Sequence, residues 1–228
     1  MRHIVVGGGG VGSFLLPVLC RYLNFDTATT TPHEVLVIDK DTFEPRNQTR
    51  QHFTGAGGKA DVLVQMYREL FPRIQFEAHA VYLNDDNVFG YIAEGDTIFC
   101  CVDNHASRKV LTDYVETMSD GVLISGGNEY HDGNIQVHAR KQGVTILPML
   151  SYLHPEIGFP TDVHPDNLTC EDRAAEGSPQ LIFANATVAT LMCHAYWCIS
   201  KHGTIPYSEA YFDLTSGVVR PVLRTAHL

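Results

Sequence analysis

The sequence predicts an α/β protein built on a doubly wound, mostly parallel sheet, which antiparallel strands extend in its C-terminal half. Up to residue 130, short apolar runs alternate with segments whose apolar residues recur at helical spacing, and a run of glycines separates the first such pair. Beyond residue 130, apolar runs follow one another in pairs. Alternation of strand and helix is typical of parallel sheets with right-handed crossovers, whereas close pairs of strands are typical of antiparallel hairpins.

The segments before residue 72 begin the alternation. Residues 4–6 predict a buried strand, and the glycines after it lead into a helix marked by apolar residues over 14–19. Residues 35–38 predict a second strand that ends at an acidic residue. A polar, turn-rich segment over 40–58 then precedes a helix over 59–71, which the proline at the next position ends.

Residues 72–130 continue the same pattern. Strands are predicted over 75–81, 97–102 and 122–125, and the apolar residues within 110–115 mark a helix between the last two strands. The resulting order, β-α-β-α-β-α-β-α-β, also requires a helix between the strands at 75–81 and 97–102.

The pattern changes after residue 130. Residues 134–139 and 144–147 predict an antiparallel hairpin, and a proline-rich stretch of little periodicity follows over 148–180. Residues 181–199 predict a helix that is apolar nearly all round, which we expect the sheet or a second subunit to bury. Residues 207–214 and 218–223 predict a closing hairpin. We find no boundary between domains, so we expect one unit over 1–228, with halves at 1–130 and 131–228.

The composition is that of an ordinary globular protein. The 228 residues are 44% hydrophobic and 18% charged, which excludes wholesale disorder and a coiled-coil rod. Sixteen basic and 26 acidic side chains give a net charge of −10, which disfavours nucleic acid and anionic lipid as partners. We expect no membrane span, because no stretch approaches ~20 apolar residues. The N-terminus carries no signal-peptide core, which predicts a cytoplasmic protein.

The glycine run is the first motif that points to a ligand. Gly7-x-Gly9-x-x-Gly12 stands between a strand and a helix, where glycines permit a tight turn and the helix N-terminus attracts phosphate. This is the context of the Rossmann-like nucleotide fingerprint. Asp39, at the end of the second strand, is placed to accept hydrogen bonds from ribose hydroxyls. The motif predicts a nucleotide without separating NAD, FAD and ATP.

Four further motifs occur in the order expected of one family. They are Asp39-x-Asp41, then Asn47 with Arg50-Gln51, then Gly57-Gly58-Lys59 at a helix start, and finally Asp103-Asn104 with Arg108 after a strand. With the glycine run, this series resembles the ThiF/MoeB/HesA superfamily, the adenylation domain shared with ubiquitin-activating enzymes. Arg46 and Gln48 depart from the serine and leucine of the family pattern around Asn47.

The resemblance implies ATP-dependent adenylation of a carboxylate, with ATP and Mg²⁺ bound. Arg50 and Lys59 would stabilise the phosphate charge, and Asp103 would hold Mg²⁺. The nucleotide-binding residues implied are Gly7, Gly9, Gly10, Gly12, Asp39, Asp41, Asn47, Arg50, Gln51, Lys59, Asp103 and Asn104. The alternative for each cation is a solvated side chain, and for Asp103 a helix cap.

The cysteines carry a second set of expectations. Thr169-Cys170-Glu171 occupies the place where some family members use a cysteine to accept the acyl group, so Cys170 is a candidate nucleophile; a thiol that merely lies in the loop is the alternative. The chain has no C-x-x-C pair, so we expect no structural zinc.

The resemblance also implies partners. The acceptor carboxylate would be the C-terminal glycine of a ubiquitin-like or sulfur-carrier protein, and a homodimer would form through the hairpins or the late helix. Three other functions remain open: a non-catalytic nucleotide-binding or interaction protein, an adenylating dehydratase acting on a small molecule or tRNA, and an NAD-dependent oxidoreductase. The last leaves Arg50 and Lys59 without a role.

Overall fold

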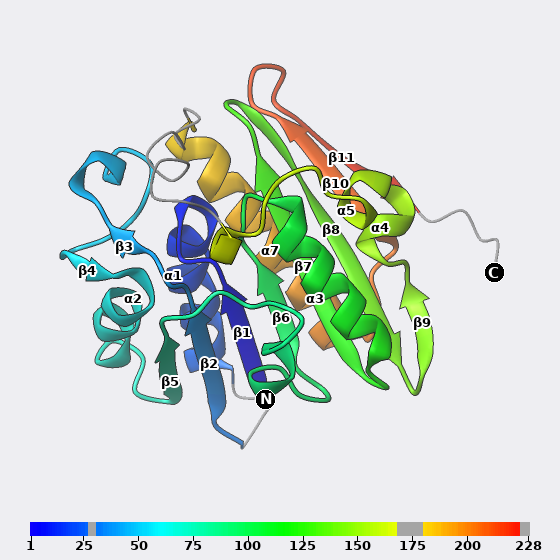
Figure 1. Ribbon diagram of the computed structural model, residues 1–228, viewed down its shortest axis with the longest axis horizontal. Helices are drawn as coiled ribbons and strands as arrows, with labels where there is room; N and C mark the ends of the chain where they lie inside the picture. The colour runs from blue at the N-terminus through cyan, green and yellow to red at the C-terminus, as the bar shows by residue number, and fades with distance from the viewer. Residues whose placement is uncertain (27–30, 168–179, 224–228) are drawn as a thin grey trace.

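Nine strands form one mixed sheet in the computed structural model, which describes residues 1–26, 31–167 and 180–223. They are β1 (Arg2–Val6), β2 (His33–Ile38), β5 (Ile74–His79), β6 (Thr97–Cys100), β7 (Gly121–Asn128), β8 (Asp132–Lys141), β9 (Val144–Leu147), β10 (Tyr207–Asp213) and β11 (Val218–Leu223). Eight of them lie in the order β11-β10-β8-β7-β6-β1-β2-β5, and β9 pairs with β8 (Figure 1).

The two halves of the sheet differ in strand direction, as predicted. Strand β1 pairs in parallel with β2 and β6, and the outer pairs β2–β5 and β6–β7 are parallel too. Strand β8 then pairs antiparallel with β7, β9 and β10, and β10 forms an antiparallel hairpin with β11. The predicted fold class, Rossmann-like with an antiparallel C-terminal extension, is confirmed.

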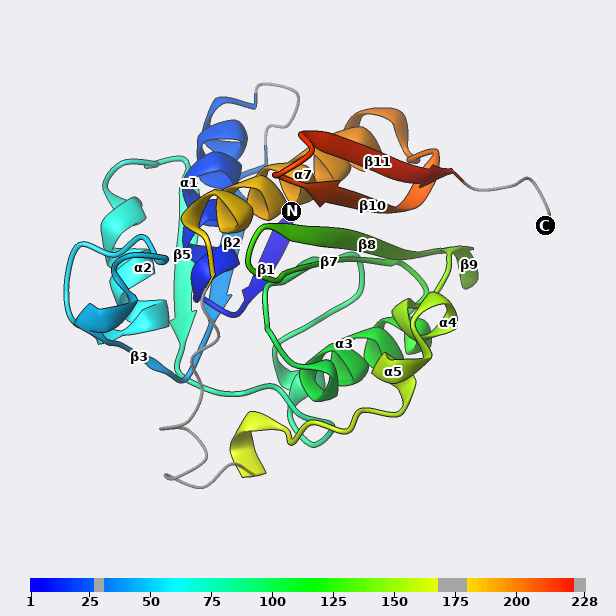
Figure 2. The same cartoon turned by 90° about the horizontal axis from the view of Figure 1, so that it is seen from above.

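Helices cover both faces of the sheet (Figure 2). One face carries α1 (Gly10–Phe25), α2 (Lys59–Arg68) and α7 (Ile182–His202), and the other carries α3 (His105–Thr117), α4 (Leu150–Leu153) and α5 (Pro155–Gly158). Alternate residues of β1 supply both cores: Val5 packs in the cluster under α1 and α7, while Ile4 and Val6 pack in the cluster under α3. Successive residues of a strand point to opposite faces, and both faces of the parallel strands are covered by helices. The sequences of these strands are therefore apolar without interruption.

One predicted helix is absent. All residues between β5 and β6 are described, and they form a single 3-10 turn, η2 (Val88–Gly90), instead of an α-helix. The amide oxygen of Asn87 accepts a hydrogen bond from the Asn84 backbone N–H, and that of Asn84 accepts one from Asp86. Side chains that bond nearby backbone groups in this way compete with helix formation. The proline-rich stretch also differs from the prediction, since it contains α4, α5 and the turn η3 (Pro165–Asn167).

Helix α7 is only partly buried. It packs on α1, β7 and β8, yet it leaves Phe183 65% and Trp197 41% exposed. By length and composition alone it is also apolar enough to cross a membrane, which corrects the expectation that no stretch reaches that threshold. The core helix of a globular domain meets the same criterion, and in this fold α7 is part of the larger hydrophobic core.

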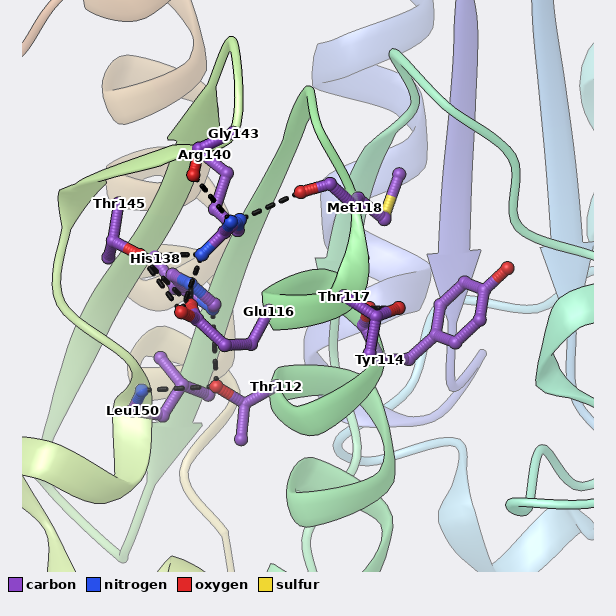
Figure 3. Close-up of polar contacts among 10 residues, drawn as sticks. All are labelled: Thr112, Tyr114, Glu116, Thr117, Met118, His138, Arg140, Gly143, Thr145 and Leu150. Carbon is purple, nitrogen blue, oxygen red and sulfur yellow. Dashed lines mark hydrogen bonds and ion pairs between the residues drawn. The ribbon is translucent and has the colours of Figure 1, made fainter.

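A partly buried polar cluster joins α3 to the antiparallel strands. Figure 3 shows the Glu116 side chain of α3 pointing toward His138 and Arg140 of β8 and Thr145 of β9. The Glu116 carboxylate accepts hydrogen bonds from Arg140 Nη1 at 2.5 Å and from Thr145 Oγ1 at 3.0 Å, and it lies 3.0 Å from His138 Nε2. Arg140 also donates to the carbonyl of Met118 at 2.7 Å. These bonds hold the C-terminal end of α3 against β8 and β9.

Candidate functional site

The sequence-predicted residues gather at the carboxyl ends of β1, β2 and β6, which are neighbours in the sheet (Figure 1). In open α/β sheets, ligands bind at this edge because the loops after parallel strands converge there. A cavity of about 240 Å³ lies elsewhere, beside His33 and Arg73 at the amino ends of β2 and β5. We place the site at the carboxyl edge because the charged groups converge there.

The glycine turn brings the start of α1 close to β6. Gly7 has a φ of +92°, and a Cβ at that position would lie 2.9 Å from the Cys101 carbonyl carbon and oxygen. A Cβ on Gly12 would lie 2.0 Å from the Gly7 carbonyl oxygen, so both positions need glycine. Helix α1 begins at Gly10 with no side-chain cap from the described part of the chain and no acidic residue in its first turn. The first N–H groups of a helix have no partner within the helix, so with the positive dipole end they suit an anion.

Asp39 holds the glycine turn in place. Its carboxylate accepts hydrogen bonds from the backbone N–H of Gly8 at 2.6 Å and of Asp41 at 2.8 Å, and the residue is 7% exposed. Burial raises the pKa of the Asp39 carboxyl, and the nearby Lys59 ammonium partly opposes that rise. A carboxylate offers about four lone-pair positions, so these two bonds leave acceptor capacity for a ribose hydroxyl.

Lys59 is a buried cation surrounded by carboxylates. It is the first residue of α2, is 8% exposed, and donates from Nζ to Asp41 Oδ2 at 2.9 Å. Burial on its own would lower the pKa of this ammonium, but Asp39, Asp41 and Asp103 together raise its pKa above the ordinary value. Lys59 therefore stays charged at neutral pH. Tyr82 also donates its hydroxyl hydrogen to Asp41.

Arg50 lies on a loop closed by a small ribbon of β3 (Thr42–Phe43) and β4 (Gly57–Gly58). Its guanidinium donates to Asn47 Oδ1 at 3.0 Å and to Gln180 Oε1 at 3.1 Å. The side chain of Gln51 is buried against the glycine turn, with its Nε2 3.7 Å from the position of a Cβ on Gly9. The loop therefore carries Arg50 to the same edge as the glycine turn.

The loop after β6 presents Asp103 to this edge. Asp103 is exposed and is close enough to Lys59 to raise its pKa. Asn104 is the N-cap of α3, because its Oδ1 accepts the Ser107 N–H at 2.8 Å. The helix cap, which was the alternative role for Asp103, is thus supplied by Asn104. The predicted contact of Asn104 with a nucleotide stays a prediction.

The N-terminus of α3 differs from that of α1 because a carboxylate already occupies it. Asp162 accepts hydrogen bonds from the backbone N–H of His105 at 2.5 Å and of Ala106 at 3.0 Å. Among the described residues no side chain caps the start of α1, so the start of α1, unlike that of α3, can accept a phosphate. The described residues contain no group of three or more His, Cys, Asp or Glu side chains that could hold a metal ion. Mg²⁺ in nucleotide sites takes one or two carboxylates besides phosphate and water, which Asp103 can supply.

Cys170 lies outside the described residues. Described residues on both sides of it contact the edge of the site: Asp166 accepts hydrogen bonds from Lys40 at 3.2 Å and Asn84 at 2.9 Å, and Gln180 accepts one from Arg50. The role of Cys170 therefore stays a prediction.

Tyr82, Gln180 and Asn185 all contact predicted site residues but were not themselves predicted from the sequence. Asn185 left one recognisable sign, since it is a polar residue within the apolar sequence Ile182-Phe183-Ala184-Asn185-Ala186. Tyr82 and Gln180 gave none, because tyrosine and glutamine are ordinary residues in loops.

Comparisons with known sequences agree with this arrangement. A model described as the ThiF family matches residues 1–214. The chain is 32% identical over 140 residues to the adenylyltransferase and sulfurtransferase UBA4 of Candida albicans, covering 60% of this chain and 30% of that protein. It is 26% identical over 180 residues to the protein of the same name from Lodderomyces elongisporus, covering 77% and 36%. The chain thus spans about a third of the length of these relatives.

Solved structures share the fold. A crystal structure of E. coli MccB with ATP matches with a TM-score of 0.69 at 15% identity, covering 97% of this chain and 63% of the MccB chain. A crystal structure of PaaA matches with a TM-score of 0.71 at 10% identity, covering 97% of this chain and 72% of that one.

Proposed function

Because this chain belongs to the ThiF family, we propose that it is an adenylyltransferase that uses ATP to activate a carboxylate. The proposed acceptor is the C-terminal glycine of a small ubiquitin-like or sulfur-carrier protein. The curated relatives named adenylyltransferase and sulfurtransferase support this class of reaction, and the ATP in the MccB crystal structure supports the choice of nucleotide.

The proposed reaction is an in-line displacement at the α-phosphorus of ATP. A carboxylate oxygen of the acceptor forms a bond to the α-phosphorus while the bond from that phosphorus to the oxygen bridging the β-phosphate breaks. The products are an acyl-adenylate and pyrophosphate. No general base is required, because the carboxylate is already ionised at neutral pH. The protein's contribution is to hold the two reactants in line and to stabilise negative charge on the phosphate oxygens.

One observation carries the proposal: a charged, buried lysine and an arginine loop lie beside the N-terminus of α1, which no side chain of the described residues caps. In this assignment the glycine turn binds phosphate through backbone N–H groups, and Lys59 and Arg50 neutralise the developing charge. Asp39 orients the ribose and Asp103 holds Mg²⁺. Pairing with Asp41 keeps the Lys59 ammonium charged in place before a nucleotide enters.

A second step would transfer the acyl group to sulfur. The thiolate of Cys170 would attack the acyl carbon, form a thioester and release AMP. The sulfurtransferase activity in the relatives' names favours such a step. Intact mass spectrometry after incubation with ATP and acceptor checks it: a thioester adduct should form on the wild type and be lost in Cys170→Ser.

We also propose a homodimer in the cytoplasm, with residues 1–130 binding nucleotide and residues 131–228 contributing the second half of one domain. The exposed side of α7, with Phe183 and Trp197, and the exposed valines and leucine of strand β11 form apolar surfaces that a second copy would cover. Light scattering of the purified protein should give about twice the 25.3 kDa mass of the chain if this is right. A mass of one chain would contradict the homodimer.

ATP–pyrophosphate exchange tests the proposed activity. The wild type is assayed with purified ubiquitin-like and sulfur-carrier proteins as acceptors, and we expect exchange that depends on one of them. Asp103→Ala should lose it. Asp113→Ala is the matched control, because Asp113 is a partly exposed aspartate of α3 that pairs with Lys109 instead of facing the site. Unchanged exchange in Asp103→Ala would contradict the proposed metal-binding role.

A further inference from the structure

Asn185 is a fully buried polar residue on α7, between apolar neighbours. Its side-chain Nδ2 donates a hydrogen bond to the backbone carbonyl oxygen of Arg50 at 3.0 Å. The two residues are 135 positions apart in the chain, so this bond fixes the arginine loop to a helix of the opposite half. The bond is made to the backbone, so it constrains where the Arg50 side chain begins.

The same side chain also touches the start of α1. A Cβ on Gly10 would lie 2.6 Å from Asn185 Nδ2, 2.7 Å from its Oδ1 and 2.8 Å from its Cγ. The amide therefore occupies the space that any larger residue at position 10 would need. Asn185 is wedged between the arginine loop and the first residue of the helix whose N-terminus is the proposed phosphate site.

A second contact from the same region reaches the guanidinium itself. Gln180, two residues before α7 begins, accepts a hydrogen bond from Arg50 Nη1 at 3.1 Å. Asn47 Oδ1 accepts from the other terminal nitrogen at 3.0 Å. The backbone and the side chain of Arg50 are thus held separately, the first by Asn185 and the second by Gln180 and Asn47.

Packing alone does not account for an asparagine at this position. Its Oδ1 is buried and has no hydrogen-bond partner among the described residues, and a buried polar atom without a partner costs free energy. A leucine of similar volume would avoid that cost. A residue that lowers the stability of the fold in this way is expected at a functional site, where it is kept because function needs it.

We infer that Asn185 is a positioning residue, which fixes the arginine loop against the phosphate-binding turn. The inference rests on the proposed function, since Asn185 would affect catalysis only through the positions of Arg50 and the glycine turn. Without the Asn185 amide donor, the backbone of the Arg50 loop is no longer hydrogen-bonded to α7. The guanidinium then no longer has a fixed distance from the phosphates. A displacement of ~1 Å in such a group can reduce a rate by ~100-fold.

The first experiment is a double-mutant cycle on exchange kinetics. Asn185→Leu should lower kcat for ATP–pyrophosphate exchange by roughly 10- to 100-fold. In an Arg50→Ala background the same substitution should change kcat less than about twofold, because effects that pass through one residue are not additive. An equal fold-change in both backgrounds would overturn the inference. Asn24→Leu is the control, since Asn24 is a buried asparagine that accepts a backbone N–H, from Arg73, far from the site.

The second experiment separates positioning from packing. Gly10→Ala would push its new methyl group into the Asn185 amide, and Asn185→Ala makes room for that methyl group. The double variant should regain the melting temperature that Gly10→Ala loses, yet remain defective in exchange. Recovery of both properties would mean that Asn185 only fills space and would overturn the inference.

A readout without turnover keeps the inference distinct from the proposed function. Hydrogen–deuterium exchange of the backbone amides over residues 47–53 should be faster in Asn185→Leu than in the wild type and unchanged in Asn24→Leu. This holds whether or not an acceptor is known. If the wild type shows no pyrophosphate exchange with any acceptor, the proposed function fails, while faster deuterium uptake in Asn185→Leu still supports the positioning role. Equal uptake in all three proteins would overturn it.

Discussion

Removing the Asp39 carboxylate should affect both the stability of the glycine turn and the affinity for ATP. In Asp39→Ala, the backbone N–H groups of Gly8 and Asp41 lose their acceptors, which lie at 2.6 Å and 2.8 Å. The Gly8 group is buried, whereas that of Asp41 is only partly buried and can turn to water. The two losses are therefore unequal.

The magnitude follows from these two bonds. A buried donor left without an acceptor costs ~1–3 kcal/mol, and a partly exposed one costs less. Burial raises the pKa of the Asp39 carboxyl, which means that keeping the carboxylate charged in the fold costs free energy. Asp39→Ala removes that cost, and this offsets a part of the loss. We expect Asp39→Ala to lower the free energy of unfolding by about 2 kcal/mol, which is roughly 4–8 °C in melting temperature for a protein of this size. Asp39→Asn keeps one acceptor oxygen, so its free energy of unfolding should fall by less than that of Asp39→Ala.

Thermal unfolding and calorimetric titration with ATP–Mg²⁺ measure the two effects on the same samples. Asp96→Ala is the matched control, because Asp96 is 3% exposed and accepts the Ala93 N–H at 2.8 Å, at the amino end of β6. The control should lose stability with no change in ATP affinity, whereas Asp39→Ala should lose both. A melting temperature within about 1 °C of the wild type, or an unchanged dissociation constant for ATP, would refute the reasoning about Asp39.

Three further predictions concern other residues. Lys59→Met should reduce pyrophosphate exchange on the order of 100-fold, because the site loses a buried cation; exchange within twofold of the wild type would contradict this. Burial lowers the pKa of His3 to about 3, far below the unfolded value of 6.5, so the neutral ring is favoured in the folded state and stability falls as the pH drops below 6.5. Between pH 7.5 and 5.5 this group should cost about 1.4 kcal/mol in urea unfolding, and His3→Gln should show a correspondingly smaller loss; identical pH profiles would argue against the assignment. Glu116→Gln, in the cluster of Figure 3, should destabilise the fold by ~1–2 kcal/mol without changing ATP affinity, because the cluster ties α3 to the antiparallel strands away from the site. A weaker affinity for ATP in this variant would show that the two regions are coupled.

Local patterns predicted most of the fold and the chain segments of the site. The glycine turn, the acidic end of β2 and the lysine at the start of α2 follow from rules on strands, turns and helix starts, so the sequence alone places residues such as Gly7 and Asp39. The prediction of a helix between β5 and β6 was wrong because the side chains of Asn84 and Asn87 accept hydrogen bonds from nearby backbone N–H groups and form a turn. The spacing of apolar residues does not reveal such bonds.

The contacts that complete the site could not be predicted in the same way. Asn185 reaches Arg50 across 135 positions, and Tyr82 reaches Asp41 across 41, so both depend on how the layers pack rather than on local sequence. The exposed side of α7 shows the same limit. Its composition predicted burial by the sheet or by a second subunit, and composition does not say which face of the helix meets the sheet.

The claim on which this account depends is that a nucleoside triphosphate binds between the start of α1, Arg50, Lys59 and Asp103. Isothermal titration of the wild type with ATP–Mg²⁺, and separately with NAD⁺, measures it without an acceptor protein. We predict one ATP bound per chain, no heat with NAD⁺, and at least tenfold weaker ATP binding in Arg50→Ala and Lys59→Ala. Binding of NAD⁺ in preference to ATP, or ATP affinity unaffected by both substitutions, would contradict it.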